Sequence, residues 1–262
     1  MSGNAPELGA IATGAFFYKY SSLARPEQLE WLKSILHNHE LYLPSLDQLN
    51  DPADGRPALA PLSESELISF LYESFKKANP NAGRAYLKTH EHIIRINVHK
   101  HGTERLQRLL SESLNKELEG YRVYSLSKRY NNLSLWAKYA NNHTGYCLEF
   151  ANTGVLFSSV REVRYGDCVK MDLNSSEHRS GYWFFWKRRD WSNEEEVRLV
   201  VQRGKGSRVK IDSGWLTRLI LGEKMSNINR ETISRWAEER DPQLSVVNAY
   251  FDPLDQTVKL KI

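Results

Sequence analysis

Cysteine is scarce in this sequence, which has two among 262 residues, Cys147 and Cys168. They form no CxxC pair, so the chain has neither a disulfide framework nor a zinc-finger spacing, and we expect reduced, packed thiols. Long apolar runs are also missing, because no stretch reaches the roughly 18 residues of a membrane helix. The first fifteen residues, MSGNAPELGAIATGA, are small and weakly apolar, without a charged leader. These absences predict a cytoplasmic protein without a membrane partner, with a flexible segment over residues 1–15.

An excess of one charge is missing as well. Lys and Arg number 36 against 32 Asp and Glu, a balance too even to indicate a polyanionic partner. The chain has no P-loop and no GxGxxG motif, and Gly204 and Gly206 are more typical of a β-turn than of a phosphate cradle. No compact set of carboxylates points to a metal site, so we expect no metal cofactor, and a nuclease is poorly supported.

The length and the apolar content of 40% are sufficient for a full core. No long Pro/Gly/Ser linker interrupts the chain, so we expect one domain over residues 1–262. The first 120 residues repeat apolar side chains at helical spacing, and Ser63 with Glu66 has the spacing of a capping box. The apolar stripes are Leu29, Leu32, Ile35 and Leu36; Leu67, Phe70, Leu71 and Phe75; and Leu106, Leu109, Leu110 and Leu114.

The pattern after residue 120 changes to short β-rich runs. These are YRVYSLS, GYCLEF, VREVRY, EEVRLVVQ, RVKID, LTRLIL, SVVNAYF and TVKLKI, with helices expected over residues 132–140, 175–188 and 226–239. Strands gathered in one half argue for an α+β fold rather than a doubly wound sheet. We therefore predict a helical N-terminal half packed on a mainly antiparallel sheet from the C-terminal half, a sheet that can be split in two.

Alternation along two strands places polar side chains together. In YRVYSLS, Ser125 and Ser127 share a face, and around EEVRLVV the residues Glu194, Glu196 and Arg198 share another if the strand begins early enough to include Glu194. A neighbouring Arg can hold one Glu ionised while it positions the other. The alternative is a solvated face or a cross-strand salt-bridge ladder.

Two loops near the start also carry polar groups. The segment 16-FFYKYSSL-23 is typical of an aromatic strand that ends in hydroxyls. In 46-LDQLNDPADG-55, Asn50 and Asp51 are residues that cap or turn the backbone. Pro52 fixes its backbone angle φ, and Gly55 allows a wide range of φ. The second segment forms a tight turn or one wall of a site.

The ordered set YKY, LNDPADG, SLS with LSLWAKYANNHTGYCLEF, and WSNEEEVRLV resembles the bacterial domain-of-unknown-function family 2971 over about residues 16–222. That family is defined by sequence rather than by a reaction. The same order of parts is similar to that of ADP-ribosyltransferases, whose first element holds the nicotinamide nucleotide. The resemblance implies an NAD-using transferase or NAD glycohydrolase, with a protein or nucleic-acid acceptor and a role as a toxin or phage-defence effector.

The resemblance also implies roles for single residues. Glu196 is the carboxylate that grips a ribose hydroxyl and stabilises an oxocarbenium-like transition state, and Glu194 orients the nucleophile. The remaining expected binding residues are Tyr18, Lys19, Tyr20, Asn50, Asp51, Ser125, Ser127, Trp136, Tyr139, His143 and Arg198. The aromatic Tyr20, Trp136 or Tyr139 would stack on nicotinamide. The chain departs from the pattern at Lys19, where the superfamily commonly has Arg or His.

Other constellations favour simpler explanations. The run 90-HEHIIRINVHKH-101 suggests a solvated helix, since its neighbouring histidines point apart. His143 lies in a polar loop, where it orients a substrate group or bonds the turn. The segments 182-YWFFWKRRDW-191 and 203-RGKGSRVK-210 offer a non-catalytic nucleic-acid-binding module as the alternative function. We prefer a buried aromatic helix that ends in a cationic turn for residues 182–191.

Overall fold

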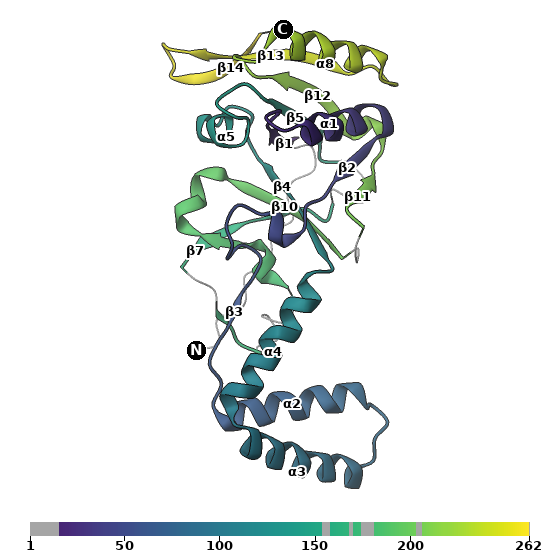
Figure 1. Ribbon diagram of the computed structural model, residues 1–262, viewed down its shortest axis with the longest axis vertical. Helices are drawn as coiled ribbons and strands as arrows, with labels where there is room; N and C mark the ends of the chain where they lie inside the picture. The colour runs from purple at the N-terminus through teal and green to yellow at the C-terminus, as the bar shows by residue number, and fades with distance from the viewer. Residues whose placement is uncertain (1–15, 154–157, 168–169, 174–180, 203–205, 262) are drawn as a thin grey trace.

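The structure, a computed structural model, describes residues 16–153, 158–167, 170–173, 181–202 and 206–261 (Figure 1). The predictions for residues 1–15 and for Cys168 lie outside these residues. Cys147 is a free and fully buried thiol, as expected. In the described part of the chain, no helix is both long enough and apolar enough to cross a bilayer.

Most of the α-helices lie in the first half of the described chain and most of the strands in the second half, as the sequence indicates. The α-helices are α1 (Pro26–Asn38), α2 (Glu64–Ala78), α3 (Arg84–His101), α4 (Thr103–Leu118), α5 (Leu133–Lys138) and α8 (Asn227–Glu239). Short 3-10 helices are η1 (Leu46–Gln48), η2 (Tyr182–Phe185), η3 (Arg189–Glu194) and η4 (Ser213–Trp215). The strands are β1 (Phe16–Ser21), β2 (Glu40–Tyr42), β3 (Ala58–Leu59), β4 (Tyr121–Ser127), β5 (Tyr146–Ala151), β6 (Arg161–Glu162), β7 (Arg164–Gly166), β8 (Lys170–Met171), β9 (Trp186–Arg188), β10 (Glu196–Gln202), β11 (Arg208–Lys210), β12 (Leu216–Leu221), β13 (Ser245–Asp252) and β14 (Thr257–Lys261).

One sheet of eight strands organises the fold, in the order β14-β13-β12-β5-β1-β4-β10-β6. All its neighbours are antiparallel except β12 and β13, so the α+β class with a mostly antiparallel sheet is confirmed. The strand β1 comes from the N-terminal half and lies at the centre of this sheet. It pairs with β4 at one position only, Tyr18 opposite Ser127. The paired length of β1 and β4 is therefore the shortest between neighbouring strands of this sheet.

The two faces of the sheet hold different apolar clusters. Phe17, Leu148 and Phe150 pack with α1 and α8 on one face, where Leu32 and Ile233 are fully buried. The other face packs against α5 through a second cluster. Because both faces of β5 are covered, its residues Tyr146–Phe150 are all buried, as a central strand requires.

Three helices extend away from the sheet. Figure 1 shows α2 and α3 at the end opposite α8, with α4 leading back to β4. The predicted capping box is confirmed at α2, where the Ser63 amide donates to Glu66 Oε2 at 2.8 Å. The run rich in histidine forms α3, as predicted, and Val98 is its buried residue.

The helix predicted over residues 175–188 is wrong where the structure describes it. Residues 174–180 lie outside the described part, Tyr182–Phe185 form one 3-10 turn, and Trp186–Arg188 form β9, which pairs in parallel with β7. Gly181 has a φ of +80°, which ends any continuous helix there. Gly166 lets the Trp186 ring approach, since a Cβ at Gly166 would lie 2.4 Å from that ring.

The polar segment between α5 and β5 is a tight backbone turn. Asn141, Asn142 and His143 all have positive φ, and Asn tolerates this conformation better than most residues do. The Gly145 amide donates to the Ala140 carbonyl oxygen at 2.8 Å. A Cβ at Gly145 would lie 2.2 Å from the backbone oxygen of Ser21, so this turn requires glycine.

We expect Gly145→Ala to lower the free energy of unfolding by about 2–3 kcal/mol, the upper part of the range for overpacking. The added methyl group meets backbone oxygens that cannot move aside. Gly83→Ala is the matched control, because a Cβ there meets nothing within 4 Å, and its cost should stay below about 1 kcal/mol. Urea unfolding measures both, and equal losses in the two variants would contradict the steric explanation.

Candidate functional site

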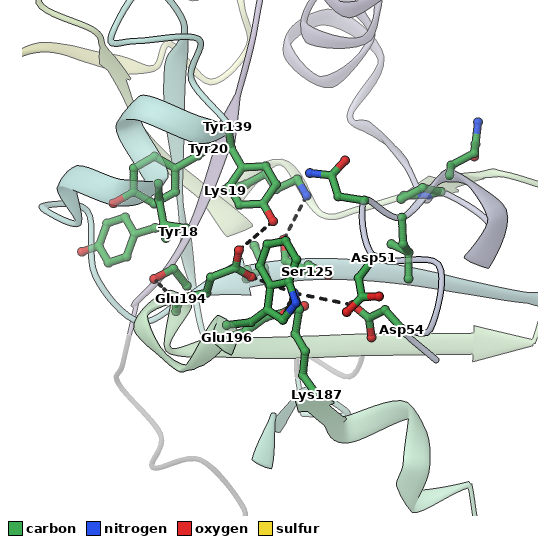
Figure 2. A pocket seen from close by; sticks show the side chains of 18 residues that line it. Tyr18, Lys19, Tyr20, Asp51, Asp54, Ser125, Tyr139, Lys187, Glu194 and Glu196 are labelled. Atoms are coloured by element: carbon green, nitrogen blue, oxygen red, sulfur yellow. Dashed lines mark hydrogen bonds and ion pairs between the residues drawn. The ribbon is translucent and has the colours of Figure 1, made fainter. Parts of the chain in front are cut away.

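A cavity of about 210 Å³ opens where β1 and β4 separate (Figure 2). Its walls come from β1, the segment from Pro44 to Asp54, β4, α5 and the chain around η3. The lining residues are Tyr18, Lys19, Tyr20, Pro44, Gln48, Leu49, Asn50, Asp51, Asp54, Ser125, Leu126, Ser127, Leu135, Tyr139, Lys187, Trp191, Glu194 and Glu196. Ten of the thirteen residues predicted for a site are in this set, and Trp136, His143 and Arg198 are not.

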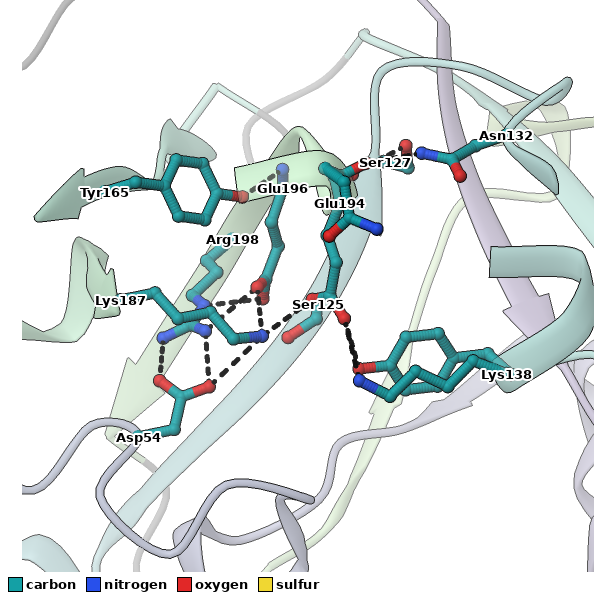
Figure 3. A network of polar contacts seen from close by, with 12 residues as sticks. Asp54, Ser125, Ser127, Asn132, Lys138, Tyr165, Lys187, Glu194, Glu196 and Arg198 are labelled. Atoms are coloured by element: carbon teal, nitrogen blue, oxygen red, sulfur yellow. Dashed lines mark hydrogen bonds and ion pairs between the residues drawn. The ribbon is translucent and has the colours of Figure 1, made fainter. Parts of the chain in front are cut away.

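The buried amine of Lys187 joins three carboxylates on one side of the cavity. Its Nζ donates to Glu194 Oε2 at 2.7 Å and to Glu196 Oε2 at 2.9 Å, and lies 3.5 Å from Asp54 Oδ2. All four side chains are almost completely inaccessible to solvent. Figure 3 shows them converging from β9, β10, η3 and the segment after η1. The side chains of Glu194 and Glu196 are thus brought together by Lys187 and not by strand alternation, because Glu194 ends η3, Glu195 has a φ of +45° and β10 begins only at Glu196.

Arg198 lies behind the cavity and is fully buried. Its guanidinium holds Asp54 through two bonds of 2.6 Å and Glu196 through bonds of 2.6 and 3.0 Å. A further bond of 2.8 Å reaches the carbonyl oxygen of Phe184. These five bonds match the five N–H donors of an arginine side chain. Arg198 therefore positions Glu196 and the Asp54 loop rather than binding a ligand itself.

Three buried carboxylates face the buried cations Lys187 and Arg198, and the partly exposed Lys138 also contacts Glu194. Burial raises the pKa of Glu196, but attraction by Arg198 and Lys187 outweighs it and lowers this pKa to about 2. Burial opposes the charge on Lys187, and the surrounding carboxylates more than compensate, so the pKa of Lys187 is raised. Glu196 and Lys187 are therefore charged at neutral pH, and the same carboxylates raise the pKa of Arg198.

The second carboxylate, Glu194, contacts the cavity wall formed by α5. Tyr139 donates its hydroxyl to Glu194 Oε1 at 2.7 Å, and Lys138 Nζ lies 3.4 Å from the same oxygen. Burial and the nearby Glu194 charge raise the pKa of Tyr139, so its phenol stays protonated. Glu194 thus links Tyr139 and Lys138, which contact its Oε1, to Lys187, which contacts its Oε2.

The two serines of β4 have different roles. A hydrogen bond from the Ser125 side chain to Glu196 helps to lower the pKa of that carboxyl. Ser127 donates to the backbone oxygen of Glu194 at 3.1 Å and is buried. Ser125 therefore supports a carboxylate of the site, and Ser127 fixes the backbone where β10 begins.

The aromatic residues of β1 line the cavity with their rings and use their hydroxyl groups elsewhere. Tyr18 donates to Glu149 Oε2 at 3.1 Å, and Tyr20 donates to the backbone oxygen of Arg129 at 2.7 Å. Lys19 lies between them in the sequence, and its Nζ donates to the backbone oxygen of Ser125 at 3.0 Å.

Trp136 and His143 lie outside the cavity. Trp136 is completely buried against Tyr20 and donates its indole N–H to the backbone oxygen of Tyr130 at 2.7 Å. The ring has no free face, so the stacking role predicted for it has no support. His143 stacks on Trp136, with ring centroids 5.8 Å apart, and its backbone bonds the turn. Of the two roles left open for His143, the structure supports the turn.

The described side chains of the aromatic-basic segment are divided between the core, the charge network and the surface. Trp183 and Phe184 are buried, and Lys187 is in the charge network instead of ending a helix. Arg188 is exposed and pairs with Asp190 at 2.6 Å. Within the basic hairpin, residues 203–205 lie outside the described part, and Arg208–Lys210 pair with β2.

A second hollow of about 450 Å³ adjoins the cavity and shares five lining residues with it. These shared residues are Asn50, Asp51, Leu135, Trp191 and Glu194. The hollow adds the cations Lys138 and Arg188, and Lys138 Nζ lies 3.2 Å from the centre of the Trp191 ring. An aromatic face with two cations suits a ligand that has both a ring and negative charge.

Sequence reasoning missed Asp54, Lys187, Lys138 and Trp191 as members of the site. Asp54 lies in the quoted motif LNDPADG and Trp191 in WSNEEEVRLV. Neither residue has a spacing to other polar residues that distinguishes a site residue from a residue of a turn. In the described residues, no group of three or more His, Cys, Asp or Glu side chains is arranged to hold a metal ion. Comparison of the chain with protein-family models, with curated proteins and with solved structures gave no match.

Proposed function

We propose that the cavity binds the nicotinamide end of NAD and that the protein cleaves the bond between nicotinamide and ribose, with transfer to water or to an acceptor. One observation carries this proposal: Lys19 of β1, Ser125 and Ser127 of β4 and Glu196 of β10 line one cavity, and three buried carboxylates lie together on one side of it. The nicotinamide ring of NAD is a cation, and the reacting ribose carbon becomes positive as the bond breaks. Both are stabilised by a preplaced carboxylate.

The roles of the residues follow from their positions. The C–N bond breaks with its electron pair going to nicotinamide, and positive charge develops on the ribose carbon close to Glu196. Arg198 and Lys187 keep Glu196 ionised and fixed, so no reorganisation is needed during the reaction. Water or an acceptor then forms a bond to the ribose carbon and gives its proton to Glu194, which Tyr139 orients.

The dimensions of the site fit one end of a dinucleotide. The cavity of about 210 Å³ is smaller than the roughly 300–1,000 Å³ of pockets that enclose whole ligands. The nicotinamide and its ribose occupy this space, and the pyrophosphate lies in the adjoining hollow near Lys138 and Arg188. The acceptor is then a protein or nucleic acid that approaches from the open side. Membership of family 2971 stays a prediction beside this proposal.

The test is the release of nicotinamide from NAD, with and without protein and nucleic-acid acceptors. We expect Glu196→Gln to reduce release at least about 100-fold, the loss typical of removing one group that stabilises a transition-state charge. Glu195→Gln is the control, because the adjacent Glu195 pairs with the exposed Arg129 away from the network. Glu195→Gln should retain the activity of the wild-type protein.

Folding is verified by urea unfolding of both variants. If folded Glu196→Gln cleaves NAD as fast as the wild-type protein does, Glu196 has no part in the reaction. If the wild-type protein releases no nicotinamide with any acceptor, the proposed function is wrong.

A further inference from the structure

Lys19 is unusual among the cationic side chains around the cavity. Lys138, Lys187 and Arg198 each have a carboxylate within 4.0 Å, and no carboxylate of the described residues lies that close to Lys19. Its Nζ donates to the carbonyl oxygen of Ser125 and lies 4.8 Å from the centre of the Tyr124 ring. Figure 2 shows the amine reaching in among the cavity side chains. Lys19 is thus a cavity amine without an ion-pair partner.

The position of Lys19 follows from the gap in the sheet. The pairing of β1 with β4 stops at Tyr18 and Ser127, so the Ser125 carbonyl oxygen has no β1 amide opposite it. The Lys19 side chain supplies the missing donor. This bond fixes the nitrogen at the cavity through one N–H group and leaves the rest of the amine toward the space where a ligand would bind.

Burial without a counter-ion favours the neutral amine. Burial lowers the pKa of Lys19, and this effect is larger than the attraction of either Glu196 or Glu194, which raises it. With the repulsion of Lys187, the pKa of Lys19 is lowered to about 8. An exposed lysine has a pKa near 10.4 and is almost wholly protonated at pH 8. About half of Lys19 is neutral at that pH, and a neutral amine has the lone pair needed for attack on a carbonyl group.

We propose that Lys19 forms an imine with the aldehyde group of a small ligand bound in the cavity. The amine nitrogen bonds to the carbonyl carbon and loses both hydrogens, and the carbonyl oxygen leaves as water. No electrons are transferred, so neither an oxidant nor a reductant is required. The negative charge of Glu194 and Glu196 favours the protonated imine once it has formed.

The chemical class of the ligand is an aldose in its open-chain form. Identification of that aldose as ADP-ribose rests on the proposed function, because hydrolysis of NAD frees the anomeric carbon of the ribose and the ring can then open. The covalent step itself does not depend on NAD cleavage, so the two proposals are tested separately.

The test adds an aldehyde directly to the full-length protein at pH 8 with cyanoborohydride, which reduces an imine to a stable amine. Glycolaldehyde is the small probe and ADP-ribose the larger one, and peptide mass mapping locates the labelled lysines. We expect Lys19 to be labelled at least about tenfold faster than the exposed Lys88 and Lys100 of α3. Lys19→Arg keeps a donor for Ser125 and should abolish this fast labelling.

The outcomes separate the two proposals. Fast labelling of Lys19 by both probes supports the imine and its identification with ADP-ribose, whether or not NAD is cleaved. Labelling by glycolaldehyde alone supports the imine and overturns ADP-ribose as its ligand. Lys19 labelling no faster than Lys88 overturns the inference, even where nicotinamide release shows that the proposed function holds.

Discussion

Arg198→Met should lower the free energy of unfolding by about 3–5 kcal/mol, the cost of breaking a buried ion pair by removing one partner. The substitution keeps most of the side-chain volume but removes all five hydrogen bonds of the guanidinium. Asp54 and Glu196 then stay buried with Lys187 as their remaining partner. A buried carboxylate without its partner loses the solvation that water provides in the unfolded chain.

Urea unfolding at pH 7 measures this loss. Arg188→Met is the matched control, because Arg188 also pairs with a carboxylate at 2.6 Å but is 60% exposed. Exposed pairs contribute about 0–1 kcal/mol, so the control should be close to the wild-type protein. If both variants lose the same small amount, the Arg198 bonds do not contribute to stability as their burial implies.

Strand alternation was the part of the sequence that predicted the site best. It puts Ser125 on the same side as Glu196 and Arg198, because a strand side chain has few directions available. Glu194 lies in η3, before the strand begins, so alternation does not explain its place. The approach of β1 to β4 depends on pairing between segments about 100 residues apart, which no local pattern reports. The motif order predicted which segments meet, and the structure has them lining one cavity.

The partners of the carboxylates were not predictable in the same way. Lys187 follows five aromatic residues and precedes two arginines, so its sequence context indicates a cationic helix end. The short strand β9 instead directs it inward, where three carboxylates hold it. Trp136 shows the opposite error, since a Trp in a polar segment suggests a ligand contact and here fills the core. Burial of single residues is a property of the whole fold.

Lys187 is the cation that contacts all three buried carboxylates, so its charge offsets part of theirs. In the wild-type protein the pKa of Glu196 is about 2, below the value of about 4.3 for an unfolded Glu. The stability that this shift contributes is complete above about pH 5 and is lost as the pH falls toward 2. Between pH 5 and 8 Glu196 therefore adds no pH dependence.

Lys187→Met should make the free energy of unfolding depend on pH in this range. Asp54 and Glu196 then keep only Arg198, and Glu194 keeps only the partly exposed Lys138 as cationic partners. Burial then raises the pKa of at least one of the three carboxylates above its unfolded value. Such a group takes up a proton on folding, so the variant gains stability as the pH falls, by up to about 1.4 kcal/mol per pH unit. We expect a loss of about 3–5 kcal/mol at pH 8 that shrinks toward pH 5.

Urea unfolding of the wild-type protein and of Lys187→Met at pH 5, 6, 7 and 8 measures the difference directly. Lys138→Met is the control, since Lys138 also pairs with Glu194 but is 37% exposed, and its loss should stay below about 1 kcal/mol at every pH. A loss in Lys187→Met that is equal at all four pH values would show that Lys187 acts through packing. A loss that shrinks with acid would show that Lys187 acts through its charge and, together with Arg198, holds the buried carboxylates ionised, as the proposed reaction requires.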